Sequence, residues 1–196
     1  MFQHLEIILA SGSPRRKKLL EEAELSFTVK TSDVEETYPN SLPKMMIPEF
    51  LAAKKAEAVR KVFSNNKFII AADTIVLQDN KILGKPKNRA DAIFKLKSLS
   101  GAVHQVITGV CLCYQGEKKT FSASTNVFFK RLSKEIVTHY VDQYHPLDKA
   151  GAYGIQEWIG LVGIDRIEGD YFNVVGLPVS RVLAEMFKME HLVNKS

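Results

Sequence analysis

The sequence predicts an α/β protein in which helices flank a mixed, twisted β-sheet. Short apolar runs, which are typical of buried strands, alternate along the chain with amphipathic segments of helical spacing. The chain has 196 residues, of which 45% are hydrophobic. This size suits one domain, or two small lobes that share a central cleft.

The first predicted strand and helix are joined by small residues within the segment 7–20. Residues 7–9 are apolar, Ser13 suits the N-cap, and Pro14 suits the first helical position, where no N–H is needed. Cations follow at 15–18, at the positive end of the helix macrodipole, where each should cost roughly 0.3–1 kcal/mol. This helix start indicates either a site for an anion such as a polyphosphate or a solvated basic turn.

The remaining elements follow from the same two periodicities. The predicted strands are 25–31, 68–77 with an interruption at 73–74, 81–83, 103–114, 120–130 and 161–167. The predicted helices are 48–63, a helix capped by Asn88 that ends near 99, a helix from Ser133 to 144, and a last helix whose apolar face is Val182, Leu183, Met186 and Phe187. A glycine-rich loop occupies 148–156.

Charge and composition restrict the partners. The net charge of +5 favours anionic partners such as nucleotides, nucleic acid or anionic lipid. The N-terminal residues lack a signal-peptide pattern, and no apolar run approaches the ~20 residues needed to span a bilayer. Cys111 and Cys113 should face the same side of a strand as reduced thiols. We therefore expect a cytoplasmic protein that has no membrane partner.

Asp73 is the sharpest candidate for chemistry, because it interrupts an apolar run. A buried carboxylate is costly unless it is paired or bound to metal, and active-site carboxylates often occupy such positions. The alternative is an aspartate that starts a tight turn between two short strands. Glu36, in an acidic patch, could join Asp73 in holding Mg²⁺ or Mn²⁺, or it could be a solvated loop charge.

Other candidates are weaker when they are taken alone. Lys55 shares a helix with Lys54, so one of the two should point inward. Lys85 could reach the same site as Asp73, or it could be an exposed lysine before a proline, and His104 is most simply a strand histidine. The sequence has no Walker loop, no G-x-G-x-x-G after a strand, no H-E-x-x-H and no G-x-S-x-G. Polyphosphate chemistry with an activated water remains.

Taken together and in order, several segments resemble the Maf-like nucleotide pyrophosphatases over almost the whole chain. The matching segments are LASGSPRR (9–16), ADTIV (72–76), GKP (84–86), LSG (99–101) with His104 and TGV (108–110), DKAGAYGIQ (148–156) and NVVGLP (173–178). The resemblance implies a single Maf-like domain over 1–196, with the two-lobed fold of the Maf and ITPase proteins, and a homodimer. It also implies hydrolysis of a nucleoside triphosphate to the monophosphate and pyrophosphate with a divalent cation.

The resemblance also implies roles for particular residues. Asp73 would be the catalytic carboxylate that accepts a proton from the attacking water, and Glu36 and Asp73 would hold the metal. The residues that would bind the phosphates are Ser11, Arg15, Arg16, Lys55 and Lys85.

Base preference is implied by three positions, at which Arg15, Thr74 and Gln156 match members that cleave dTTP and UTP. A branch that acts on 7-methyl-GTP has Trp, Gln and Glu there. One amide can satisfy both the N3–H donor and a carbonyl acceptor of thymine or uracil. We therefore expect a dTTP/UTP pyrophosphatase, with modified pyrimidine nucleotides as further candidates. The segment 157–159 is bulkier than the expected glycine-rich continuation.

Other functions remain open at this point. The chain could be a nucleic-acid-binding or cell-division (septum) regulatory protein, although it has no basic stripe interleaved with aromatic residues. It could also be a pyrophosphatase directed at purine or 7-methyl-GTP substrates, a house-cleaning enzyme for damaged nucleotides, or a phosphomonoesterase.

Overall fold

The predicted α/β class is confirmed by a computed structural model that describes residues 2–63 and 65–193. The strands are β1 (Ile7–Leu9), β2 (Phe27–Val29), β3 (Phe68–Gln78), β4 (Lys81–Ile82), β5 (Val103–Tyr114), β6 (Glu117–Phe129) and β7 (Ile164–Glu168). The helices are α1 (Pro14–Glu22), α2 (Ile47–Arg60), α3 (Arg89–Leu99), α4 (Lys134–Tyr144), α5 (Trp158–Gly163), α6 (Tyr171–Val175) and α7 (Val179–Val193). Short 3-10 segments are η1 (Lys44–Met46), η2 (Pro146–Asp148) and η3 (Ala150–Ala152).

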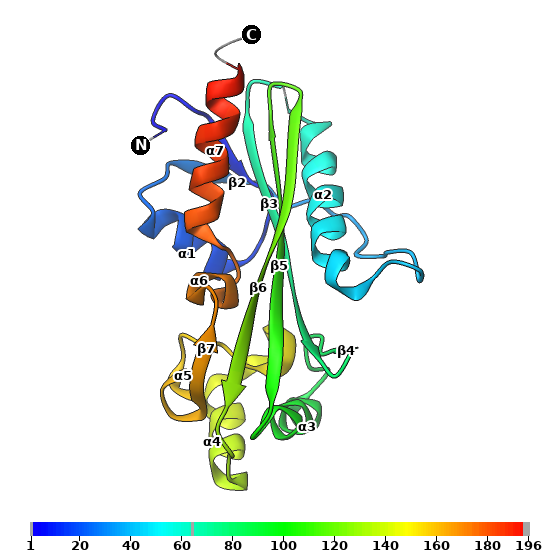
Figure 1. Cartoon of the computed structure of the whole chain (residues 1–196), viewed down its shortest axis with the longest axis vertical. Helices are drawn as coiled ribbons and strands as arrows, with labels where there is room; N and C mark the ends of the chain where they lie inside the picture. Colours follow the sequence, from blue (N-terminus) through cyan, green and yellow to red (C-terminus); the bar gives the residue numbers. More distant parts are fainter. Residues whose placement is uncertain (1, 64, 194–196) are drawn as a thin grey trace. The chain divides into compact units, whose positions relative to one another are not determined.

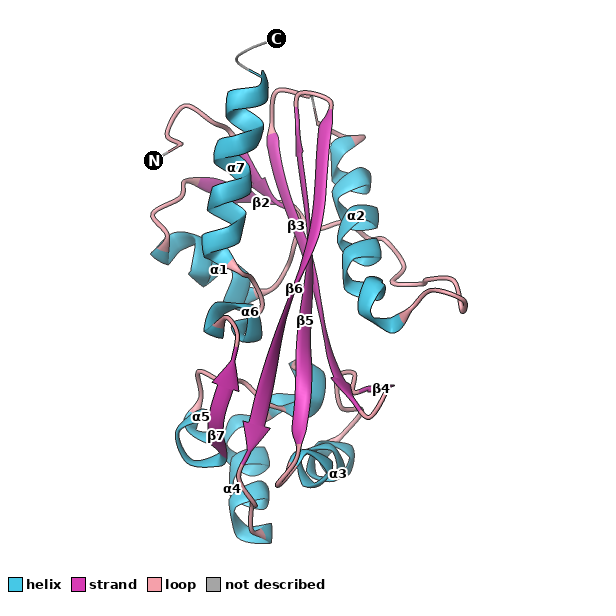
Figure 2. Ribbon diagram, in the orientation of Figure 1, coloured by secondary structure: helices cyan, strands magenta, loops and turns pink. Residues whose placement is uncertain are grey.

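The described strands form a seven-stranded mixed sheet in the order β2-β1-β3-β5-β6-β7, with β4 paired to β3 (Figure 2). Strand β1 lies parallel to both β2 and β3, whereas β4 is antiparallel to β3 and β7 is antiparallel to β6. The strand predicted at 25–31 is β2, which ends the sheet on one side. The mixed sheet predicted from the alternating pattern is therefore confirmed.

The chain divides into two compact units. Unit 1 comprises Met1–Asp73, Thr108–Ala123 and Gly176–Ser196, and unit 2 comprises Thr74–Ile107 and Ser124–Val175. The boundaries fall within β3, β5 and β6, so these three strands contribute residues to both units. The cleft expected between two lobes stays a prediction.

Helix α2 covers one face of the sheet in unit 1, and Figure 1 draws α2 on the opposite side of the strands from α7. The core under α2 joins Ile8, Ala10, Ile69, Ala71, Cys111 and Cys113 of the sheet side to Ala52, Ala56 and Val59 of α2. Because side chains alternate between the faces of a strand, the sequence Ile69, Ala71, Asp73 continues along the face that α2 covers. The strand therefore aims Asp73 at this helix.

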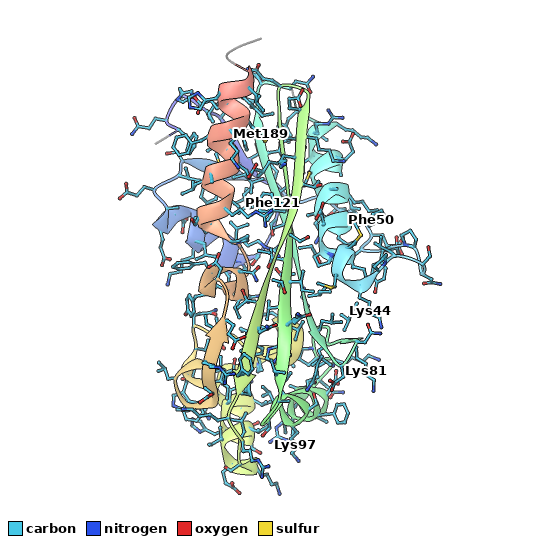
Figure 3. All side chains as sticks on the ribbon, viewed as in Figure 1. Lys44, Phe50, Lys81, Lys97, Phe121 and Met189 are labelled. Carbon is cyan, nitrogen blue, oxygen red and sulfur yellow. The ribbon has the colours of Figure 1, made fainter. Side chains whose placement is uncertain are left out.

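Helix α7 contributes a narrower apolar face than the sequence predicts. Its buried residues include Val182, Met186 and Met189, at the spacing of one helical stripe. Figure 3 labels Met189 on α7 and Phe121 on β6, and both are almost fully buried. The prediction that Phe187 is buried is wrong: its side chain is 40% exposed and packs at the edge of the core against the ring of Phe2.

Gly109 of β5 lets the start of α2 approach the sheet closely. A Cβ atom at this position would lie 2.1 Å from the backbone nitrogen of Glu49 and 2.2 Å from the carbonyl carbon of Pro48. No side chain fits at that separation, so glycine is required where the first turn of α2 rests on β5. This contact fixes the helix that carries Lys54 and Lys55.

Unit 2 has its own core of helices and aromatic rings. Helix α3 packs against α4, η2 and η3. His104 is buried, and its Nε2 lies 2.7 Å from the hydroxyl of Tyr153, while the ring of Phe129 packs against both. Burial lowers the pKa of His104 to about 4, so its imidazole is neutral at pH 7. The interpretation of His104 as a strand histidine agrees with this packing.

The predicted helix N-caps are confirmed, and one predicted strand is partly wrong. Ser13, Asn88 and Ser133 each accept a hydrogen bond at the N-terminus of their helix. The predicted strand 161–167 is confirmed only from Ile164, because 158–163 form α5. The N–H of Gly160 donates to the carbonyl of Glu157 at 2.8 Å and closes a helical turn there. A short apolar run does not distinguish such a turn from a strand.

Two further expectations can be compared with the described residues. Cys111 and Cys113 are buried free thiols with their sulfur atoms 3.9 Å apart, as expected for two cysteines on one face of a strand. Among the helices described between residues 2 and 193, none has the length and apolar character needed to cross a membrane.

We predict that Gly109→Ala lowers the free energy of unfolding, because the new methyl group must displace the backbone at the start of α2. The expected loss lies at or above the upper end of the roughly 1–3 kcal/mol that overpacking usually costs. Gly84→Ala is the matched control, because a Cβ there meets no atom within 4 Å and its stability should stay within about 0.5 kcal/mol of the wild type. Denaturant unfolding of both variants measures the difference, and equal stability would contradict the close approach.

Candidate functional site

Asp73 lies within β3, which runs without interruption from Phe68 to Gln78. The alternative interpretation of Asp73 as the start of a tight turn is therefore wrong. The residue is only 8% exposed. An ionised carboxylate at such a position requires charged or hydrogen-bonding partners, and unit 1 supplies them.

Lys55 of α2 is the direct partner of Asp73. Its ammonium nitrogen lies 2.6 Å from Oδ1 of Asp73. Lys55 occupies the same helical stripe as Ala52, Ala56 and Val59, which pack on the sheet. The stripe that anchors α2 therefore also aims the lysine at the carboxylate.

Glu36 joins this pair from the loop after β2. Its Oε1 lies 2.7 Å from the ammonium nitrogen of Lys55, so one ammonium is bound by two carboxylates. The neighbouring Lys54 points elsewhere and donates to the carbonyls of Glu35 and Thr37 at 2.8 and 3.2 Å. Lys54 thus holds the backbone on both sides of Glu36. The prediction that one of the two lysines points inward is confirmed.

Arg16 and Ser11 form the second part of the site, at the start of α1. The Arg16 guanidinium is buried, donating from one terminal nitrogen to the Ser11 hydroxyl and from Nε to the Gly176 carbonyl, both at 2.9 Å. Gly176 has φ of +136°, a conformation that side chains disfavour. The N–H of Ser13 also donates to Ser11 Oγ at 3.3 Å. Arg16 is therefore held in place by the segment that follows α6.

The charges of the site influence one another. Burial raises the pKa of Asp73, while the positive charges of Lys55 and Arg16 act in the opposite direction. Burial also lowers the pKa of Arg16, and the carboxylate of Asp73 opposes that change. A raised pKa makes Asp73 a stronger proton acceptor than an exposed aspartate, as a general base requires.

The structure brings five of the predicted site residues together within unit 1: Ser11, Arg16, Glu36, Lys55 and Asp73. Arg15 is half-buried beside Arg16 in the same unit. The other three belong to unit 2, where Thr74 follows Asp73 on β3 and is half-buried, while Lys85 and Gln156 are exposed. Whether Lys85 and Gln156 reach the substrate bound at Asp73 stays a prediction.

The two carboxylates fit the expected divalent cation. Mg²⁺ is commonly held by one or two carboxylates together with substrate phosphates. One oxygen of Asp73 and one oxygen of Glu36 both bind the ammonium of Lys55, so the two carboxylates lie close enough together to bind one cation. Within residues 2–63 and 65–193, no group of three or more His, Cys, Asp or Glu side chains could hold a metal by itself. Oxygens of the substrate would therefore complete the coordination.

Comparison with known proteins gives the family. The model of the family described as Maf-like protein matches residues 6–189. The chain belongs to the Maf-like family. It is 50% identical over 184 residues to a dTTP/UTP pyrophosphatase of Cytophaga hutchinsonii, covering 94% of this chain and 84% of that protein. It is also 50% identical over 193 residues to a dTTP/UTP pyrophosphatase of Phocaeicola vulgatus, covering 96% of this chain and all of that protein.

Among solved structures, the Maf-like chain matches a HAM1 protein of Coxiella burnetii at 17% identity with a TM-score of 0.48, over 65% of this chain and 74% of that one. The family expected from the ordered motifs is confirmed by the family model, and the expected subgroup agrees with the names of these relatives.

Two participants in the Maf-like site were not found from the sequence. Lys54 holds the loop of Glu36 through backbone carbonyls, and no residue pattern identifies a carbonyl as a partner. Gly176 accepts from Arg16 across 160 positions of the chain. Its place in the NVVGLP segment was a signal of function, but only the fold shows what it contacts.

We predict that Lys55→Met destabilises the protein, because it leaves the buried Asp73 carboxylate without its nearest counter-charge. Breaking such a pair costs about 3–5 kcal/mol, and the double variant Lys55→Met/Asp73→Asn should recover most of the loss because it also removes the buried Asp73 carboxylate. Lys61→Met, at an exposed lysine that follows α2, is the control. Denaturant unfolding at pH 7.5 measures all three. A double variant no more stable than Lys55→Met would refute the pairing.

Proposed function

We propose that this chain is a nucleoside triphosphate pyrophosphatase that hydrolyses dTTP and UTP to the monophosphate and pyrophosphate. The observation that carries the proposal is the buried carboxylate of Asp73 with the cations of Lys55 and Arg16 beside it. A negatively charged polyphosphate needs these cations, and an attacking water needs a proton acceptor. The names of relatives at 50% identity support the same activity and the same substrates.

The reaction begins when a water molecule attacks the α-phosphorus. Asp73 accepts the proton of the water as the new P–O bond forms and the bond to the bridging oxygen of the β-phosphate breaks. Lys55, Arg15, Arg16 and Lys85 bind phosphate oxygens and stabilise the charge that grows on the departing pyrophosphate. The hydroxyl of Ser11, which accepts a hydrogen bond from Arg16, lies just before the start of α1. Backbone N–H groups at the start of a helix can donate hydrogen bonds to phosphate oxygens.

A divalent cation held by Asp73 and Glu36 would supply further neutralisation of the phosphate charge. Lys55, which binds both carboxylates in the structure, would then be available to bind phosphate oxygens of the substrate. We also propose, from the sequence pattern, that the protein acts in the cytoplasm and, from the family resemblance, that it forms a homodimer.

Gln156 reads the base in this proposal. Its amide donates through NH₂ and accepts through the carbonyl oxygen, and it can therefore satisfy a carbonyl and the N3–H of uracil or thymine together. Cytosine presents the opposite arrangement at these atoms, with an unprotonated N3 and an amino group. Thr74 is next to Asp73 in the sequence, and Arg15 is next to Arg16. The other two residues that we associate with base preference are therefore adjacent to residues that we propose act on the phosphates.

A nucleotide panel tests the activity. With Mg²⁺ or Mn²⁺, dTTP and UTP should yield equal amounts of monophosphate and pyrophosphate. Their kcat/KM should exceed those of CTP, GTP, dATP and 7-methyl-GTP by roughly tenfold or more. Chromatography separates the products, and a chelator provides the metal-free control. Release of orthophosphate, or binding of oligonucleotides without turnover, would overturn the proposal.

We predict that Gln156→Glu lowers kcat/KM for dTTP and UTP by roughly 10–100-fold, since a carboxylate only accepts and repels the carbonyl oxygens of the base. Gln143→Glu introduces the same charge at an exposed position of α4 in the same unit and should leave both values unchanged. Steady-state kinetics on the panel measures the effect. An equal loss on every nucleotide would contradict the assignment of base recognition to Gln156.

A further inference from the structure

A network of buried polar groups supports the loop that carries Gln156. Tyr140 of α4 is fully buried, and its hydroxyl accepts from the N–H of Gly154 at 3.0 Å. The same hydroxyl donates to Oε2 of Glu157. One tyrosine therefore contacts the residue two positions before Gln156 and the residue immediately after it.

Lys149 binds the same carboxylate from the start of the loop. Its side chain is buried, and its nitrogen lies 3.1 Å from Oε1 of Glu157 and 2.7 Å from Oδ1 of Asp148. The N–H of Glu157 also donates to the carbonyl of Gly154 at 3.0 Å, which closes the turn around Gln156. Both ends of the segment 148–157 thus meet at Glu157.

The ends of the Glu157 and Lys149 side chains lie close to Gly154. A Cβ atom at Gly154 would lie 3.0 Å from the carboxyl carbon of Glu157 and 3.2 Å from Cε of Lys149. Burial raises the pKa of the Tyr140 hydroxyl above its usual range, so it stays protonated and continues to donate to the carboxylate. These contacts together hold the turn around Gln156.

Stability alone does not explain a buried Lys–Glu pair. Such a pair generally contributes no more to folding than apolar side chains of similar volume would, whereas it restricts the number of conformations that satisfy its charges. Glu157 also stands where the sequence departs from the glycine-rich continuation that the family resemblance leads us to expect. The charge of Glu157 is therefore a feature of this chain, and its contribution to stability does not account for it.

We propose that Tyr140, Lys149 and Glu157 are positioning residues for base specificity, which hold the turn 154–157 so that the amide of Gln156 meets the pyrimidine at a fixed place. This inference rests on the proposed function. Recognition through hydrogen bonds requires polar groups held within about 0.5 Å of the productive geometry. A looser turn would still allow a triphosphate to bind at the residues of unit 1, but it would discriminate poorly among bases.

The test is the ratio of kcat/KM for UTP to that for CTP. Tyr140→Phe keeps the ring and removes the hydroxyl, and we expect the ratio to fall roughly tenfold, the effect of one hydrogen bond of this kind. The loss should appear mainly as a higher KM for UTP, with kcat within about twofold of the wild type, since a loose turn leaves the reacting groups in place. Tyr144→Phe, on the same helix and with its ring stacked on Tyr140, is the matched control and should keep the ratio.

A second pair of variants changes Glu157, the partner of Tyr140. Glu157→Leu should lower the ratio as Tyr140→Phe does, whereas Glu157→Gln keeps one oxygen that accepts from Tyr140 and places its NH₂ opposite Lys149, so its ratio should fall less than that of Glu157→Leu. This rescue by the conservative variant separates positioning from packing, and thermal unfolding of each variant shows that it is folded.

The possible outcomes are distinct. The inference is overturned if Tyr140→Phe and Glu157→Leu keep the wild-type ratio, or if they lower turnover of both nucleotides equally. A wild-type enzyme that does not prefer UTP over CTP would overturn the proposed base preference, and this inference with it, before any variant is compared.

Discussion

The ion pair between Asp73 and Lys55 is the interaction on which the rest of unit 1 depends. A carboxylate in the middle of a buried strand is unfavourable unless a cation reaches it, and Lys55 reaches it only if α2 lies directly on the sheet. Gly109 allows that approach, and the stripe of small residues on α2 fixes which side chains face the sheet. Packing and charge thus specify the same helix position.

In our proposal, cleavage of the polyphosphate and recognition of the base depend mainly on different units of the chain. In our proposal, the carboxylate and most of the cations that act on the polyphosphate come from unit 1, where Arg16, Lys55 and Asp73 are held by buried contacts, and Lys85 comes from unit 2. The proposed base-reading residue comes from unit 2, where a separate buried network holds its turn. Substitutions in unit 2 can therefore alter the base preference without altering the groups that perform the chemistry.

The sequence predicts the local structure well, because local structure depends on local signals. Helix caps at Ser13, Asn88 and Ser133 are determined by neighbouring residues. Asp73 can be identified for a similar reason, because a charged residue within an apolar run is recognised from the neighbouring residues alone. The error at 161–163 arises because a short apolar segment fits a helical turn and a strand equally well.

The partners of the site could not be predicted in the same way. Lys55 differs from Lys54 only in lying on the face of α2 that the sheet covers. The small and apolar residues at 52, 56 and 59 mark this face in the sequence. The carbonyl of Gly176 and the backbone bound by Lys54 carry no side-chain signature. The network around Glu157 joins an α4 residue to a distant loop, and such pairs follow from the tertiary fold alone.

The most direct test of the account is the single-turnover rate of Asp73→Asn at saturating dTTP. The amide keeps the size of the carboxylate but cannot accept a proton in the same way, so the account predicts a rate roughly 10²–10⁴-fold below the wild type while dTTP still binds. A folded Asp73→Asn protein that cleaves bound dTTP within about threefold of the wild-type rate would contradict the role given to this residue.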